Sequence, residues 1–153
     1  MMLAKILREL YERDLNKLKD EIQMYENEGD LWKTAPGISN SAGNLTLHLA
    51  GNLRHYFGAV LGGTDYVRDR DAEFSSGYVP RDQILAEIDA ALSEVTAELE
   101  NLSDDKMAED YPQDVFGRPM TTGFFLVHLA SHLNYHLGQI NYHRRLLTGE
   151  LAE

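Results

Sequence analysis

The chain of 153 residues contains no cysteine, and this absence removes two kinds of chemistry from consideration. Without a thiol, no disulfide can form and no thiolate can bind a metal or attack a substrate. Long apolar runs are also missing, since no stretch approaches the roughly 20 residues of a membrane-spanning helix. Charged residues interrupt the first eighteen positions, where a secretion signal needs an unbroken apolar segment. We therefore expect a cytoplasmic protein with no membrane partner.

Basic residues are few relative to acidic ones. The chain has 14 Lys and Arg against 25 Asp and Glu, a formal net charge of −11. Binding to a phosphate backbone normally requires a concentrated basic face, so nucleic acid is not an expected partner. The length favours a single domain that spans residues 1–153 and buries a sizeable core.

Apolar residues recur at three- and four-residue spacing in four long segments, which predicts four amphipathic helices. The expected ranges are 2–28, Ser39 or Ser41 to 63, 80–102, and Thr121 or Thr122 to 147. Ser and Thr supply capping oxygens, and Pro80 suits a first helical turn. The stretches 64–79 and 103–120 show neither a helical nor a strand period, and we expect them to be loops. The predicted fold class is all-α, a four-helix bundle with two long connecting loops.

Acidic residues are absent between Asp30 and Asp65 and again between Asp114 and Glu150, and these two gaps contain all six histidines. The gaps coincide with the second and fourth predicted helices. We expect the first and third helices to present acidic faces to water, without a function of their own. The second and fourth helices are expected to be specialised for something else.

The histidines of the fourth predicted helix fall on one stripe. Because a helix advances about 100° per residue, His128, His132, His136 and His143 lie within about 80° of one another. On the second helix, His48 and His55 are about 20° apart. Apolar residues flank both stripes, so we expect these imidazoles to face the interior.

A single histidine on an apolar face is usually a core residue bonded to a backbone carbonyl. Six of them, with no carboxylate nearby, leave too few partners for their ring nitrogens. A divalent metal ion resolves this, because two imidazoles at i and i+4 and one from a facing helix make a three-point site with a free position. Zinc and nickel are the expected ions. A haem bundle with paired histidines also remains open.

Other bundle sites and hydrolase motifs are absent from the sequence. Di-iron bundles need Glu-x-x-His, and no glutamate stands three residues before any histidine. The zinc-protease pattern fails because Leu129 and Leu133 occupy its glutamate position. No phosphate-binding glycine loop and no G-x-S-x-G elbow occurs.

Three segments, LTLHLAGNLRHY (45–56), RDRDAEFS (68–75) and HLASHLNYHLGQINYHRRLL (128–147), give the chain a family resemblance. It resembles the DinB-like (DinB/YfiT-type) family of metal-dependent four-helix proteins along essentially its whole length. The family pattern His-x-x-x-His followed by Gly-Gln matches His132, His136 and Gln139, and the third family ligand matches His48. The resemblance therefore implies a metal site made of these three histidines. His55, His128 and His143 match no ligand position, and we expect them to be core residues or to lie behind the ligand imidazoles.

The resemblance also implies an activity. Some relatives are S-transferases or isomerases that use a low-molecular-weight thiol, and others resemble hydrolases. We expect a metal-dependent thiol S-transferase or hydrolase acting on a small electrophilic molecule, with such a thiol as cosubstrate. Family members often dimerise, so a homodimer is expected. The alternatives are a non-catalytic bundle stapled by the metal or by the histidines, and a module that sequesters a small molecule.

Several neighbours are candidates to support the site. Gln139, His128 and Asn52 are expected behind the ligand imidazoles. His128 is alternatively a core residue, and Gln139 alternatively bonds to the substrate or bridges two helices. With no acid on the helices that carry the ligands, the charge of the ion favours an anionic ligand, a thiolate or hydroxide. The remaining candidates are Asn44 beside His48, Tyr135 and Tyr142 as core residues, and Arg68 and Arg70 either as solvated loop charges paired with Asp69, Asp71 and Glu73 or as a carboxylate site.

Overall fold

In the computed structural model, residues 2–149 are described, and they are helical with a single isolated bridge between Asp110 and Thr121. The elements in chain order are α1 (Met2–Met24), the 3-10 turn η1 (Glu28–Trp32), α2 (Ala42–Leu53), the π-helix η2 (Arg54–Leu61), α3 (Arg70–Ser75), α4 (Arg81–Asn101), α5 (Asp104–Ala108) and α6 (Thr122–Thr148). The predicted all-α fold class is confirmed.

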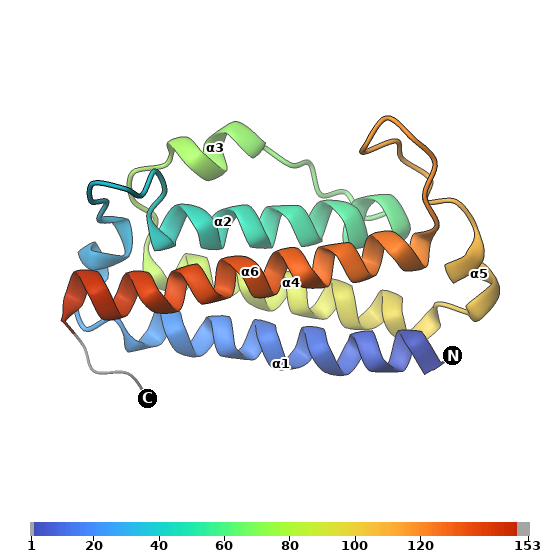
Figure 1. Ribbon diagram of the computed structural model, residues 1–153, viewed down its shortest axis with the longest axis horizontal. Coiled ribbons are helices and arrows are strands. Elements are labelled where there is room, and N and C mark those ends of the chain that lie inside the picture. Colours follow the sequence, from blue (N-terminus) through green and yellow to red (C-terminus); the bar gives the residue numbers. More distant parts are fainter. Residues whose placement is uncertain (1, 150–153) are drawn as a thin grey trace.

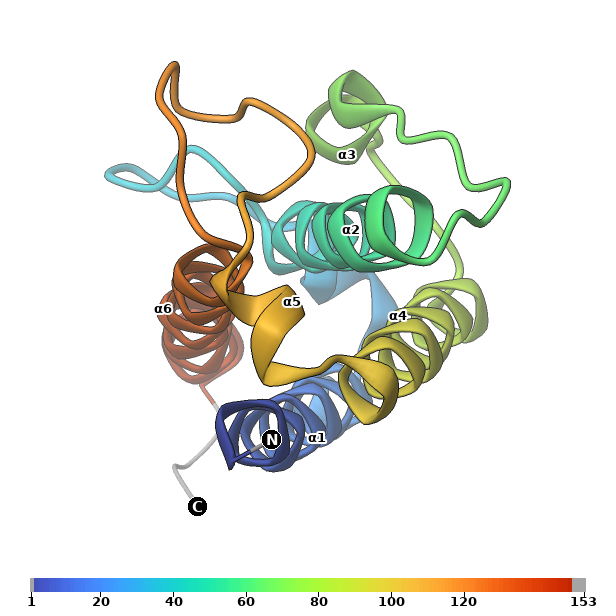
Figure 2. The same ribbon diagram turned by 90° about the vertical axis from the view of Figure 1, so that its right-hand side faces the viewer.

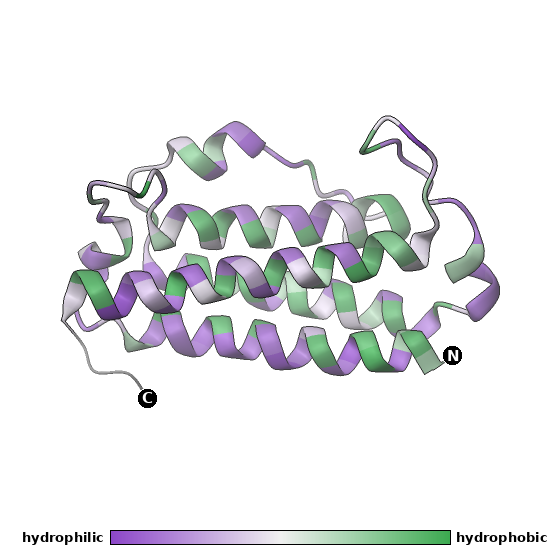
Figure 3. Ribbon diagram, in the orientation of Figure 1, coloured by the Kyte–Doolittle hydropathy of each residue, from purple (hydrophilic) through white to green (hydrophobic). Residues whose placement is uncertain are grey.

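Four long helices, α1, α2 with η2, α4 and α6, run side by side around one core (Figures 1 and 2). Short α5 lies near one end of the bundle, and α3 lies on the outer side of α2 (Figure 2). Every long helix contributes fully buried apolar side chains, such as Leu15, Leu49, Ile88 and Leu133. Hydrophilic and hydrophobic residues alternate along α1 in Figure 3, as expected of a helix with one face in the core.

Side-chain caps start the helices that carry the histidines. The Ser41 hydroxyl accepts a hydrogen bond from the Asn44 backbone at the start of α2, and Thr121 does the same for Phe124 at the start of α6. Gly149, with φ of 73°, follows the end of α6 in a left-handed conformation that suits glycine. The predicted caps Ser41 and Thr121 and the position of the last helix are therefore correct.

The other boundaries differ from the prediction in three places. The first helix ends at Met24, and the chain reaches Trp32 through the 3-10 turn η1. The second helix widens into the π-helix η2, where the Gly62 amide donates to the Phe57 carbonyl five residues back. Both expected loops contain a short helix, α3 and α5, each capped by a side chain.

Two buried tyrosines, Tyr11 of α1 and Tyr25 just after the end of α1, fix α6 in position. The hydroxyl of Tyr11 donates to the Leu126 carbonyl at 2.6 Å. Tyr25 lies against the Nδ1 atom of His143 at 2.7 Å, and Nε2 of His143 lies 2.8 Å from the Lys33 carbonyl. Both ring nitrogens of His143 therefore have partners inside the protein, which agrees with its expected role as a core residue.

The stability of the protein should fall in mild acid, in part through His143. Burial lowers the pKa of this imidazole, although the Lys33 carbonyl and Asp30 oppose the shift. The unfolded chain thus takes up the proton first, and stability is lost as the pH falls below about 6.5. Between pH 7.5 and 5 the loss is at most about 2 kcal/mol for one such group. Urea unfolding of EDTA-treated protein at both pH values measures it; a His143→Gln variant should show a smaller dependence, and an equal dependence would contradict the prediction.

No helix within residues 2–149 combines the length and the apolar character that crossing a bilayer requires.

Candidate metal centre

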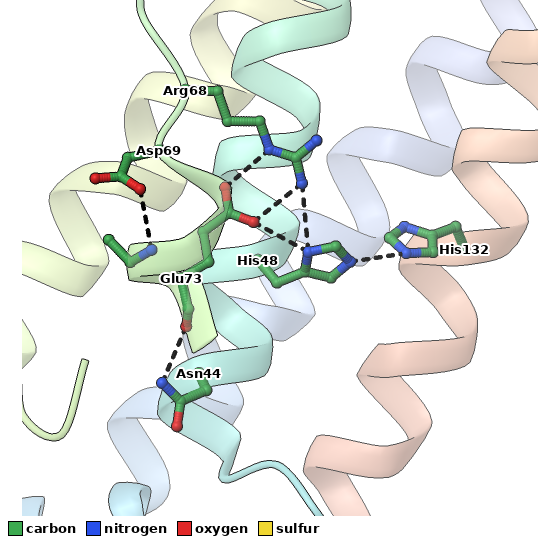
Figure 4. Close-up of polar contacts among 7 residues, drawn as sticks. Asn44, His48, Arg68, Asp69, Glu73 and His132 are labelled. Carbon is green, nitrogen blue, oxygen red and sulfur yellow. Dashed lines mark hydrogen bonds and ion pairs between the residues drawn. The ribbon is translucent and has the colours of Figure 1, made fainter. Parts of the chain in front are cut away.

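Three imidazoles from two helices converge near the middle of the bundle. His48 comes from α2, and His132 and His136 come from successive turns of α6, so that both face α2. One ring nitrogen from each lies within 4.8 Å of the other two. The Nε2 atoms of His48 and His132 are 3.1 Å apart (Figure 4). We call these three residues the His group.

The spacing suits a small divalent ion. Two nitrogens bound to one tetrahedral zinc at 2.0 to 2.1 Å lie about 3.3 Å apart, close to the observed 3.1 Å between His48 and His132. Burial and the neighbouring imidazoles of His136 and His48 lower the pKa of His132 to about 3. Burial also lowers the pKa of His136. Both rings are therefore neutral at pH 7, the form in which imidazole offers a lone pair to a metal.

A carboxylate stands behind His48. Glu73 of α3 contacts Nδ1 of His48 through Oε1 at 3.1 Å and accepts two hydrogen bonds from Arg68 at 2.9 and 3.0 Å (Figure 4). Burial alone raises the pKa of Glu73, but the bonds from His48 and Arg68 outweigh it and lower the pKa, so Glu73 is ionised. The carboxylate favours a proton on Nδ1 and leaves the lone pair on Nε2, which faces the His group.

The position of Glu73 is fixed by hydrogen bonds that hold α3 in place. The Asp69 side chain caps α3 by accepting from the Ala72 amide, and the Asn44 amide donates to the backbone carbonyls of Glu73 and Ser76 (Figure 4). Gly51 of α2 faces the Glu73 carboxylate so closely that a Cβ atom there would overlap it. Asn44 therefore supports His48 indirectly, by fixing α3, whereas the sequence suggested direct contact.

The Nδ1 atoms of His136 and His132 differ in whether they have a hydrogen-bond partner. The Nδ1 atom of His136 lies 2.7 Å from Oε1 of Gln139, so Gln139 contacts an imidazole of the His group. The Nδ1 atom of His132 is buried and has no partner among the described residues, and the same holds for Oδ1 of Asn52. An ion bound to Nε2 of His132 would leave the ring proton on Nδ1. The Nδ1 atom would then be a hydrogen-bond donor, and Oδ1 of Asn52 is a hydrogen-bond acceptor.

The chain is similar to known proteins in sequence and in fold. Residues 2–140 match the DinB superfamily. The chain belongs to the DinB superfamily. Among solved structures it is similar to a conserved protein of Enterococcus faecalis, with 17% identity and a TM-score of 0.76 over 96% of this chain and 98% of the other. It is also similar to a DinB-like protein of Bacillus cereus, with 19% identity and a TM-score of 0.67 over 86% and 84%. No curated protein matches the sequence.

The remaining histidines of the DinB chain lie outside the His group. His128 is exposed and stacks on Phe125, with ring centroids 6.1 Å apart, so it does not lie in the core. His55 is half-buried, and its Nε2 atom lies 3.0 Å from Oε1 of Gln113. The expectation that all six histidines face the interior is therefore wrong, because the histidine stripe of α6 lies at the edge of the face that is buried through Leu129, Leu133 and Ile140.

Three further expectations are corrected. A carboxylate does approach the histidines, because Glu73 comes from a segment outside the two acid-free helices. Arg68 pairs with Glu73, as expected, but only 11% of its side chain is exposed, so it is not a solvated loop charge. Tyr135 and Tyr142 are exposed and not part of the core, with 65% and 60% of their surfaces accessible.

A cavity of about 620 Å³ reaches the His group from one side. It lies between α6 and the 35–40 segment, and His136 and Gln139 form part of its wall. Tyr135, Tyr142 and Leu146 line it further along α6, and no Asp, Glu, Lys or Arg contributes to it. We call it the uncharged cavity; its volume is in the range of pockets that enclose small-molecule ligands.

Proposed function

We propose that this DinB protein binds one divalent ion, zinc or nickel, through His48, His132 and His136. The observation that carries the proposal is the convergence of three ring nitrogens within 4.8 Å, with neutral imidazoles at His132 and His136. When bound to three imidazoles, such an ion keeps a position free for water or a ligand and makes a water or thiol there more acidic.

The residues around the His group would orient its imidazoles. Glu73 accepts from Nδ1 of His48 and is itself fixed by Arg68, while Gln139 accepts from Nδ1 of His136. In each case the outer nitrogen holds the proton, and the lone pair of the inner nitrogen is left for the ion. These contacts also fix the ring planes, so little side-chain entropy is lost when the ion binds.

We further propose that the protein catalyses a metal-dependent transfer or hydrolysis on a small electrophilic molecule, with a low-molecular-weight thiol as cosubstrate in the transfer. The uncharged cavity supports an apolar substrate, because it reaches His136 and presents mainly apolar and aromatic side chains. The Glu73 carboxylate is offset by Arg68, so the acidic group nearest the His group does not cancel the charge of an ion. An anionic nucleophile, thiolate or hydroxide, is favoured there. The homodimer stays a prediction.

The experiment is elemental analysis of protein purified without chelator, followed by an assay of thiols against electrophiles. We expect about one zinc or nickel per chain and a reaction that EDTA stops. Less than about 0.2 ion per chain, with none taken up on addition of zinc, would refute the metal site. Bound metal with a large loss of thermal stability in EDTA and no turnover would instead favour a structural ion, and ligand binding without turnover a sequestering module.

A further inference from the structure

A second, smaller cavity reaches the His group from a different set of residues. Its volume is about 200 Å³, and its wall includes His48 and His132, whereas His136 lines the uncharged cavity. Arg68 and Arg70, from the start of α3 and the residues before it, form another part of the wall. We call it the cationic cavity. The two cavities share no lining residue.

The charge of this cavity is opposite in sign to the net charge of the whole molecule. The chain carries a net charge of −11, yet the cationic cavity is lined by two arginines and by no Asp or Glu. Arg68 is already paired with Glu73. Arg70 is exposed, its guanidinium lies 5.3 Å from the centre of the Phe74 ring, and within residues 2–149 it forms no ion pair with a carboxylate. A positive charge without a carboxylate partner at the edge of a cavity favours an anionic ligand.

Aromatic rings make up much of the rest of the wall. Phe125 is one of the lining residues, in edge contact with Tyr56 at 4.8 Å and with Phe116 at 6.0 Å between ring centroids. Flat walls of this kind pack well against a planar ring. The volume is below the roughly 300 to 1,000 Å³ of pockets that enclose drug-sized ligands, so the ligand is small.

We propose that the cationic cavity binds a small aromatic carboxylate, with the ring against Phe116 and Phe125 and the carboxylate toward Arg70. The positive charge and the aromatic walls belong to the chain itself, so this binding does not require a metal ion. The inference goes beyond the proposed function, because it adds a second ligand site on the other side of the His group. With the uncharged cavity, it gives the protein room for two different reactants.

Benzoate is the probe, and benzamide is its uncharged counterpart of nearly the same shape. In metal-free protein, followed by ¹H–¹⁵N NMR, we expect benzoate to bind about tenfold more tightly than benzamide, since charge-assisted hydrogen bonds are roughly twice as strong as neutral ones. The amide shifts should centre on Phe116 and Phe125. Equal affinities, or shifts centred on Tyr142 and Leu146 in the uncharged cavity, would overturn the proposal.

Two arginine variants test the role of the charge. Arg70→Gln should weaken benzoate binding about tenfold and leave benzamide binding unchanged. Arg118→Gln is the matched control, because it removes the same charge from a residue that packs on Phe124 and lies outside the cavity. It should leave benzoate binding unchanged. If the two variants weaken benzoate binding equally, the effect is one of net charge and the proposal is wrong.

His136→Ala separates this proposal from the metal site. His136 belongs to the His group but does not line the cationic cavity. In metal-free protein, this variant should bind benzoate as the wild type does. Benzoate binding by a protein that takes up no zinc would leave the inference standing and refute the proposed function, and zinc uptake without benzoate binding would do the reverse.

Discussion

Replacing either α6 imidazole of the His group by alanine is expected to reduce the zinc content from about one ion to less than about 0.2 per chain. The proposed site has three protein ligands, and His132→Ala and His136→Ala each remove one of them. Removing only a residue that supports a ligand typically weakens binding 10- to 100-fold, so loss of the ligand itself should exceed about 100-fold. Competition titration against a zinc chelator and elemental analysis measure both values.

His55→Ala and His128→Ala are the controls for this experiment. Both residues are histidines of the same two acid-free stretches, but neither belongs to the His group. Their zinc content should equal that of the wild type. Circular dichroism should show all four variants folded, because His55, His132 and His136 are only partly buried and His128 is exposed. Equal zinc loss in all four variants, or retention in His132→Ala, would contradict the assignment.

The sequence was sufficient to predict the parts of the site that lie on long helices. His132 and His136 are four residues apart within a helix of 27 residues, and helical periodicity alone places them on one face. The partner His48 followed from the family resemblance, and its distance to His132 could not be derived from spacing on either helix. Long periodic segments carry many apolar positions, so single exceptions do not obscure the pattern.

Glu73 was missed because its helix is too short to show a period. α3 has six residues, fewer than two turns, and lies in a segment that otherwise appears irregular. One local signal was present: Asp69 precedes Asp71 and Glu73, an N-cap followed by an acidic first turn. Nothing in a single sequence indicates that Glu73 contacts His48, 25 residues earlier. The map of acid-free helices was correct, but the carboxylate reaches the histidines from outside both helices.

The acidic face expected on the first helix was also only partly correct. Asp14 and Glu21 of α1 are buried and bond to α6, where Asn134 donates to Asp14 and Asn141 to Glu21. A carboxylate among exposed ones on the same helix has no distinguishing feature in the sequence. What decides its burial is the packing of α1 against α6, which brings together residues about 120 positions apart.

The buried pair of Glu21 and Arg144 leads to the largest expected change in stability. The Nε atom of Arg144 donates to Glu21 at 2.8 Å, and only 2% and 10% of the two side chains are exposed. Arg144→Leu leaves the Glu21 carboxylate in the interior with the Asn141 amide as its remaining partner among residues 2–149. Removing one partner of a buried pair costs about 3 to 5 kcal/mol. For a chain of this length, that lowers the melting temperature by roughly 10 °C.

A double variant and an exposed pair show whether burial is the cause. Glu21→Leu with Arg144→Leu should recover most of the loss, because it removes both charges and leaves apolar side chains of similar volume to pack. The exposed pair of Arg8 and Glu12, with about 40% of each side chain accessible, is the matched control. Arg8→Leu should cost less than about 1 kcal/mol. Urea unfolding at pH 7.5 measures the stability change of all three variants, and a loss in Arg144→Leu no larger than in Arg8→Leu would show that the interior of this bundle tolerates an unpaired carboxylate.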